Sequence, residues 1–179
     1  MTPDTVLDFW FSDETRPFWF AKSDGFDAQI RERFYGVWQQ AAAGELNHWR
    51  TTLRGRLAEI IVLDQFSRNL FRDSPKAFAQ DLAALCLADE AVSQPDFAAA
   101  SETDRHFILM PLMHSESRQV HERAAKLFET YTTPYAHDFE LKHKVIIDRF
   151  GRYPHRNAVL GRESTAEELE FLTQEGSSF

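Results

Sequence analysis

The sequence predicts an all-α fold, a superhelical stack of about eight antiparallel helices in a single domain, 1–179. Apolar residues recur three and four positions apart through most of the chain, as in helices that bury one face. Proline, glycine and capping residues interrupt these segments at short intervals. No alternating pattern is long enough to predict a strand. Short connections favour antiparallel neighbours.

Start and stop signals place the first elements in order. Thr2 is suited to cap a first helix that has Pro3 at its first position. Residues 12–24 are expected to form a loop with a dense aromatic patch. In 25–43, apolar residues recur at helical spacing, which predicts the second helix. A short segment, 45–52, leads from there to the longest predicted helix.

The later elements follow the same rules. The long helix is expected at 54–72, and Ser74 with Pro75 opens the next helix at 75–93. Pro95 ends that helix, because proline cannot continue the backbone hydrogen bonding. The remaining helices are expected at Glu102 to Leu112, at Ser115 to Tyr131 with Ser115 as the cap, at 135–150, and after a capping box formed by Ser164 to Glu167.

Composition sets limits on function. The chain is 43% hydrophobic and contains 16 Phe and 4 Trp, enough for one sizeable core. Its net charge of -8 argues against a general nucleic-acid binder, which carries a basic face. Basic residues gather only in 142–162, and the chain after that segment is acidic again.

The single cysteine, the N-terminal residues and the longest apolar run indicate the cellular compartment of the protein. Cys86 has no partner for an internal disulfide, and its apolar neighbours predict a buried, inert thiol. The N-terminal residues include no basic region typical of a signal peptide. The longest apolar run, Phe107 to Met113, is too short to span a bilayer. We therefore expect a cytoplasmic protein without a membrane partner.

Two charged residues lie on the apolar face of the long helix. At 100° per residue from Leu57, Asp64 falls at about 340° and Arg68 at about 20°, between Ile60 and Ile61. The other side of the helix is also apolar, as in a buried helix. Asp64 and Arg68 should therefore point inward and pair, because an unpaired buried charge is costly. They either fix helix packing or form the floor of a polar cleft.

Polar residues on two other helices repeat this pattern. His143 lies within the apolar face of 135–150, and Glu116 extends the apolar face of 115–131. Together these groups favour a shared polar interior. A metal site is not expected, because Glu140 and His143 form only one Glu-x-x-His motif, whereas a bridged metal pair needs two.

The most distinctive segment runs from Arg149 to Gly161 and reads Arg-Phe-Gly-Arg-Tyr-Pro-His-Arg-Asn-Ala-Val-Leu-Gly. Gly151 can end the preceding helix in a left-handed conformation, and Pro154 stiffens the chain after it. Arginine, histidine and asparagine are donors suited to an anion or a carboxylate.

The inward carboxylates are the expected interaction partners of this loop. We expect at least two of Arg152, His155 and Arg156 to approach Asp64, Glu116 or their neighbours, because Arg68 alone cannot balance two carboxylates. In the alternative, the arginines pair with the acidic last helix across the surface.

Several motifs together resemble a known family. They are Val6 to Phe11, Leu57 to Arg72, His114-Ser115-Glu116, Arg149 to Asn157, and Leu160 to Thr165. The chain is similar over its whole length to the bacterial domain of unknown function 924. That resemblance implies an all-α fold like that of tetratricopeptide-repeat proteins, although no 34-residue repeat is visible, and it implies no established activity.

The leading functional hypothesis is a binding module with a cleft for a small anion, a carboxylate or an acidic peptide end. The alternatives are a metal-independent enzyme that uses a carboxylate–histidine pair in the same cleft, and a scaffold with a buried polar network. No cofactor is expected, and the oligomeric state stays open. The predicted ligand-binding residues are Asp64, Arg68, Asn69, Arg72, His114, Glu116, His143, Arg149, Arg152, His155, Arg156 and Asn157.

Overall fold

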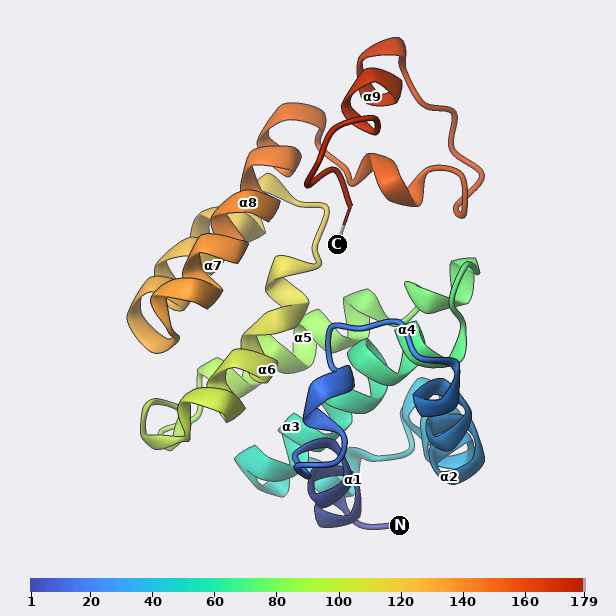
Figure 1. Cartoon of the computed structure of the whole chain (residues 1–179). Helices are drawn as coiled ribbons and strands as arrows, with labels where there is room; N and C mark the ends of the chain where they lie inside the picture. Colours follow the sequence, from blue (N-terminus) through green and yellow to red (C-terminus); the bar gives the residue numbers. More distant parts are fainter. Residues whose placement is uncertain (179) are drawn as a thin grey trace.

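The computed structural model describes residues 1–178, which form helices and turns without a strand (Figure 1). Most helices begin where a Ser or Thr hydroxyl accepts a hydrogen bond from a backbone N–H of the first turn. These caps are Thr2, Ser23, Thr52, Ser101, Ser117, Thr133 and Thr165. The α-helices are α1 (Pro3–Trp10), α2 (Asp24–Ala42), α3 (Leu53–Ile61), α4 (Ser67–Leu70), α5 (Asp81–Val92), α6 (Glu102–Met113), α7 (Arg118–Tyr131), α8 (Pro134–Phe150) and α9 (Ala166–Phe171).

A continuous central helix organises the stack. α3, a π-helical turn at Val62–Phe66 and α4 follow one another without a break. Counted as one helix, they bring the number within residues 1–178 to eight, as predicted. α1 and α5 pack on α3, and α2 packs on α4. α6, α7 and α8 follow as successive neighbours on one side (Figure 1).

Aromatic side chains fill the core around this helix. Trp10 is fully buried, and its ring lies 5.7 Å from that of Phe66 and 5.6 Å from that of Phe107. The ring of Phe34, from α2, lies 5.0 Å from Phe66. These contacts join α1, α2, α6 and the π turn, so the abundance of aromatic residues in the sequence is explained mainly by packing.

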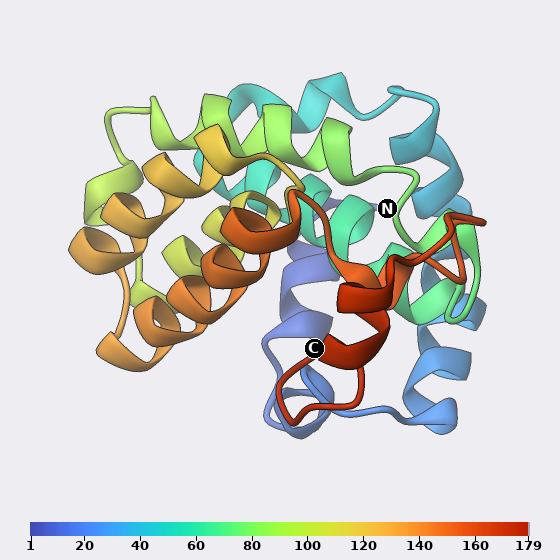
Figure 2. The ribbon, with the colours of Figure 1, turned by 90° about the horizontal axis from the view of Figure 1, so that it is seen from above.

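The chain after α8 folds back over the stack. Gly151 ends α8 with a φ of 70°, the left-handed conformation that favours glycine. The segment 152–178 then turns away from the α7–α8 hairpin toward the side that holds α1 to α4 (Figure 2). Its apolar contacts form a separate small cluster in which Ile146, Ile147 and Tyr153 are buried. Polar contacts therefore carry much of its attachment to the body.

Two predicted helix starts are wrong, and tertiary contacts explain both. Ser74 caps only a 3-10 turn at Pro75–Ala77, and α5 begins later, at Asp81. The break lets the ring of Phe78 contact two arginines at the site described below. α7 is capped by Ser117 rather than Ser115, because the carbonyl of Ser115 lies 2.8 Å from a ring nitrogen of a buried histidine.

Two smaller expectations also need correction. The last helix has its capping box one residue later than predicted, between Thr165 and Glu168. Cys86 is exposed rather than buried, because it lies on the outer side of α5 while Ala84, Leu87 and Ala88 face the core. No helix of residues 1–178 has the length and hydrophobicity that crossing a membrane requires.

Gly55 supplies a test of the packing at the start of the central helix. A Cβ at Gly55 would lie 1.8 Å from the carbonyl oxygen of Trp49, a backbone atom that cannot move aside easily. We expect Gly55→Ala to lower the free energy of unfolding by at least about 2 kcal/mol in urea titrations. Gly36→Ala, where nothing lies within 4 Å in α2, is the control and should stabilise the protein by about 0.5–1 kcal/mol. Equal effects of the two substitutions would contradict the close approach.

Candidate functional site

A carboxylate–histidine pair lies at the centre of the predicted site. Asp64 is 1% exposed, and its Oδ1 lies 2.7 Å from Nδ1 of His114, the residue that ends α6. Nη1 of Arg68 lies 3.0 Å from the same oxygen. Nε2 of Gln65 donates to the other carboxylate oxygen at 2.5 Å. Both oxygens of Asp64 are thus occupied, and the predicted Asp64–Arg68 ion pair is present.

Asp64 occupies the middle of the π-helical turn. Hydrogen bonds of a π turn span five residues, so the turn inserts one residue and rotates the following helix by about 100°. Such turns are rare and occur frequently at functional sites. The hydroxyl of Ser67 donates to the carbonyl of Leu63 at 2.5 Å and gives this part of the turn a side-chain partner. The periodicity used for the prediction assumed a regular helix and could not reveal the turn.

A second ring of charges surrounds Arg68. Asp81 accepts from both terminal nitrogens of Arg68, at 3.0 and 3.1 Å, and from Nη1 of Arg156 at 3.2 Å. The guanidinium of Arg156 lies between the rings of Phe78 and Tyr153, with its carbon 4.5 and 4.6 Å from their centroids. Nη2 of Arg156 donates to the carbonyl of His114. The C-terminal loop therefore reaches the start of α5 and the end of α6 through Arg156, and it meets Arg68 only through their shared partner Asp81.

Electrostatics define the protonation state of the pair. Burial opposes ionisation of Asp64, but the charge of Arg68 and the hydrogen bonds from His114 and Gln65 hold its pKa well below the usual range. Burial, and then the charge of Arg68, lower the pKa of His114. His114 is therefore neutral at pH 7 and, since ionised Asp64 can only accept, carries its proton on Nδ1.

The other ring nitrogen of His114, Nε2, is not engaged by another group within residues 1–178. Its side chain is 14% exposed, and Nε2 makes no hydrogen bond within residues 1–178. This atom is also not among the buried polar atoms that lack a partner. Nε2 therefore presents its lone pair to solvent or to a bound molecule.

Glu116 belongs to a neighbouring network that ties the C-terminal segment to the body. Its two oxygens accept from Nη1 and Nη2 of Arg162 at 2.6 and 2.8 Å, and one oxygen also accepts from the backbone N–H of Tyr153. Burial opposes ionisation, but these bonds lower the pKa of Glu116. Nε of Arg162 donates to the side-chain oxygen of Asn157. The cation that neutralises Glu116 is thus Arg162, which the prediction did not include.

Two of the predicted arginines point elsewhere. Arg152 pairs with Glu168 at 2.6 Å, and Arg149 pairs with Glu167 at 2.8 Å on the surface. Both contacts are to α9. At least two of Arg152, His155 and Arg156 were expected to approach Asp64, Glu116 or their neighbours; Arg156 does so, whereas Arg152 pairs with Glu168. The acidic last helix competes for these side chains because it lies beside the end of α8. The half-buried ring of His155 lies 5.5 Å from that of Tyr153.

Asn69 and Arg72 form a separate contact with α2. Both side chains donate to the carboxylate of Asp27, Asn69 at a distance of 2.7 Å. Asn69 lies in α4 and Arg72 just after it, and both side chains point toward α2 rather than toward His114. They connect two helices and are not part of the Asp64–His114 cluster.

A buried network below Tyr153 was missed entirely. Nδ1 of His121 lies 2.7 Å from Oε1 of Glu140, and both side chains are fully buried. The other nitrogen of His121 lies 2.8 Å from the carbonyl of Ser115, while the hydroxyl of Tyr153 donates to Met113. Since the carbonyl can only accept, the His121–Glu140 pair keeps a shared proton between them. Burial raises the pKa of Glu140 in agreement with that assignment.

Comparison with known proteins identifies the family of this chain. Residues 6–176 match the model of a family described as bacterial protein of unknown function, DUF924. The chain belongs to this family. It is also similar to the solved structure of a protein of unknown function, ATU0120, from Agrobacterium tumefaciens, with 37% identity over 95% of this chain and 96% of that chain and a TM-score of 0.88. The comparison with curated proteins gave no match.

Asp81, Arg162 and Tyr153 were not predicted as site residues, because their partners lie far away in the sequence. Asp81 is an ordinary acidic residue at a helix start, and only its contacts with Arg68 and Arg156 reveal its role. Arg162 belongs to the motif Leu160 to Thr165, and Glu116 is an inward carboxylate in the sequence pattern. Their ion pair could therefore have been predicted from the sequence. Tyr153 offered no signal beyond its place between Gly151 and Pro154.

Removing Arg68 tests the central cluster. Arg68→Ala leaves the buried carboxylate of Asp64 without its cation and should lower the free energy of unfolding by about 3–5 kcal/mol. The control is Arg123→Ala, which breaks an exposed pair with Asp89 and should cost less than about 1 kcal/mol. Chemical denaturation of both variants measures the change in the free energy of unfolding. A variant at position 68 that unfolds like the parent would contradict the buried pair.

Buried histidines predict a loss of stability in weak acid. Burial lowers the pKa of His106 to about 4 and that of His143 to about 3, from 6.5 when unfolded. The unfolded chain therefore binds protons first, so stability is complete above about pH 6.5 and falls as the pH drops toward 4. Urea midpoints between pH 8 and 5 measure this. His143→Gln should flatten the slope, whereas a change at the exposed His48 should not.

Proposed function

We propose that this protein is a metal-independent enzyme in which His114 acts as a general base and Asp64 orients it. The observation that carries this proposal is the 2.7 Å contact between a buried carboxylate and Nδ1 of a histidine whose Nε2 remains accessible. A carboxylate that fixes the ring and its tautomer, with the opposite nitrogen free, is the arrangement of base and orienting residue in acyl-transfer sites.

The proposed reaction is hydrolysis of an ester. Nε2 of His114 takes a proton from water while the water oxygen bonds to the carbonyl carbon or the phosphorus, and the resulting imidazolium is stabilised by ionised Asp64. The bond from that atom to the leaving oxygen then breaks, and the imidazolium returns the proton to this oxygen. Positioned acid–base groups of this kind typically contribute about 10²- to 10⁴-fold to a rate. No nucleophilic side chain is assigned, so water is the simplest nucleophile.

The geometry supports different roles for the two carboxylates. Asp64 is 1% exposed and both its oxygens are occupied, so it is suited to orientation and not to proton abstraction. Glu116 is held by Arg162 and by a backbone N–H, which likewise removes it as a base. His114 is left as the group that combines a lone pair with access.

Binding of a small anion is a second candidate, and one observation favours it. Nε of Arg156 is buried without a partner, and Arg156 is 6% exposed. Asp64 and Asp81 balance Arg68 and Arg156, so the cluster is neutral until His114 takes a proton. An anion would therefore bind more tightly at low pH. In this candidate, a tetratricopeptide-like arrangement of the helices would present the cluster as a binding surface.

Chemical modification tests the access of His114 without a known substrate. Diethyl pyrocarbonate acylates neutral, accessible imidazole nitrogens. Peptide mass spectrometry should detect modification at His114 and at the exposed His48 in the folded protein, but not at His121, whose ring nitrogens are both engaged. His114 that stays unmodified while His48 reacts would contradict the proposal.

Activity assays also test the proposed role of His114. A panel of chromogenic carboxylic and phosphoric esters should identify a hydrolysed class, and His114→Asn should lower kcat/KM by about 10²- to 10⁴-fold. Asp64→Asn should act in the same direction, and the exposed His48→Asn serves as the control. Turnover that survives His114→Asn at the parent rate would assign the activity to another site.

A further inference from the structure

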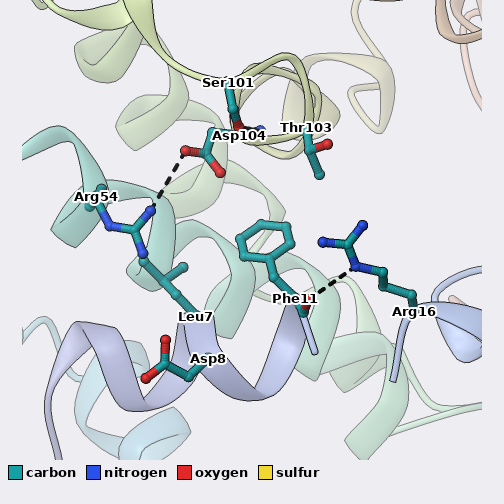
Figure 3. A pocket seen from close by; sticks show the side chains of 8 residues that line it. All are labelled: Leu7, Asp8, Phe11, Arg16, Arg54, Ser101, Thr103 and Asp104. Atoms are coloured by element: carbon teal, nitrogen blue, oxygen red, sulfur yellow. Dashed lines mark hydrogen bonds and ion pairs between the residues drawn. The ribbon is translucent and has the colours of Figure 1, made fainter. Parts of the chain in front are cut away.

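A second concave site lies beside α1, away from the Asp64–His114 cluster. It forms where α1, the 3-10 turn Arg16–Phe18, α3 and the start of α6 meet, and its volume is about 530 Å³ (Figure 3). Leu7 and Phe11 supply its apolar surface, and charged residues surround them. Volumes of this size, with an apolar base and a few polar groups, are typical of small-molecule sites.

A positioned cation, Arg16, stands on one side of this hollow. Nε of Arg16 donates to the carbonyl of Phe11 at 3.0 Å, which fixes the guanidinium (Figure 3). The carboxylate nearest to Arg16 is that of Asp13, 3.8 Å from Nε. Within residues 1–178, the terminal nitrogens of Arg16 make no hydrogen bond. They therefore remain available for a carboxylate.

An unpaired anion stands on the other side. Asp8 is exposed and makes no hydrogen bond or ion pair within residues 1–178. Figure 3 shows Arg16 beside Phe11, and Asp8 farther back along α1, next to Leu7. The remaining charges compensate each other, because Nη1 of Arg54 lies 3.8 Å from a carboxylate oxygen of Asp104. The hollow thus has a cationic end, an anionic end and an apolar middle.

We propose that this hollow binds a short peptide with free termini. Its C-terminal carboxylate pairs with Arg16, its N-terminal ammonium pairs with Asp8, and an apolar side chain packs on Phe11. An extended peptide spans about 3.3–3.6 Å per residue, so its two terminal charges can lie on either side of an apolar residue between them.

Capped peptides test each end separately. We expect Ala-Leu-Ala, titrated up to about 10 mM, to shift backbone amide NMR signals of residues 7–16 and 101–104. N-acetylation or C-amidation of the peptide should each weaken binding by about fivefold, because each removes one charged contact. Asp8→Asn should weaken binding of the free peptide but not of the acetylated one. Likewise, Arg16→Gln should weaken binding of the free peptide but not of the amidated one.

Controls separate this site from the acid–base cluster. Arg123→Ala, at an exposed pair on α7, should leave peptide affinity unchanged, and so should His114→Asn. The proposal is overturned if no signal shifts at the highest concentration, if capped and free peptides bind equally, or if the shifts gather around Asp64 and His114. Because His114→Asn keeps peptide binding, failure of the proposed catalytic role leaves this result intact.

Discussion

The buried carboxylate of Asp64 is the constraint on which the polar interior depends. A charge that is 1% exposed needs compensation from every direction, and the structure supplies it with Arg68, His114 and Gln65. These partners come from the central helix and from the end of α6. The compensation therefore links helices that the apolar core alone would join without a defined register.

The same requirement extends outward to the C-terminal segment. Arg68 needs Asp81 as a second anion, and Asp81 in turn accepts from Arg156. Arg156 is held between two aromatic rings, where a delocalised guanidinium fits well. With Glu116 and Arg162 beside it, this chain of contacts attaches residues 152–178 to the body mainly through polar groups. Segments held in this way open more readily than a helical core does.

Nearly every arginine of the predicted cleft already has a carboxylate partner. Arg149, Arg152 and Arg72 are paired with Glu167, Glu168 and Asp27. Positive charge therefore gives little reason to assign an anion site here. The distinguishing feature is the free lone pair of His114, which has the oriented tautomer that acid–base chemistry requires. Within residues 1–178, charged groups without a hydrogen bond occur instead beside α1, at the terminal nitrogens of Arg16 and at Asp8.

The sequence by itself determined the helical class, the number of helices and the inward direction of Asp64, Arg68 and His143. Apolar periodicity and capping are local, and these residues follow from them. The partner of each charge was decided only by the tertiary structure, because Asp81, Arg156 and Arg162 are brought together across long stretches of chain. The π turn and the late start of α5 have the same origin. Contacts made by Asp64 and Phe78 outweigh the regular geometry that local preference favours.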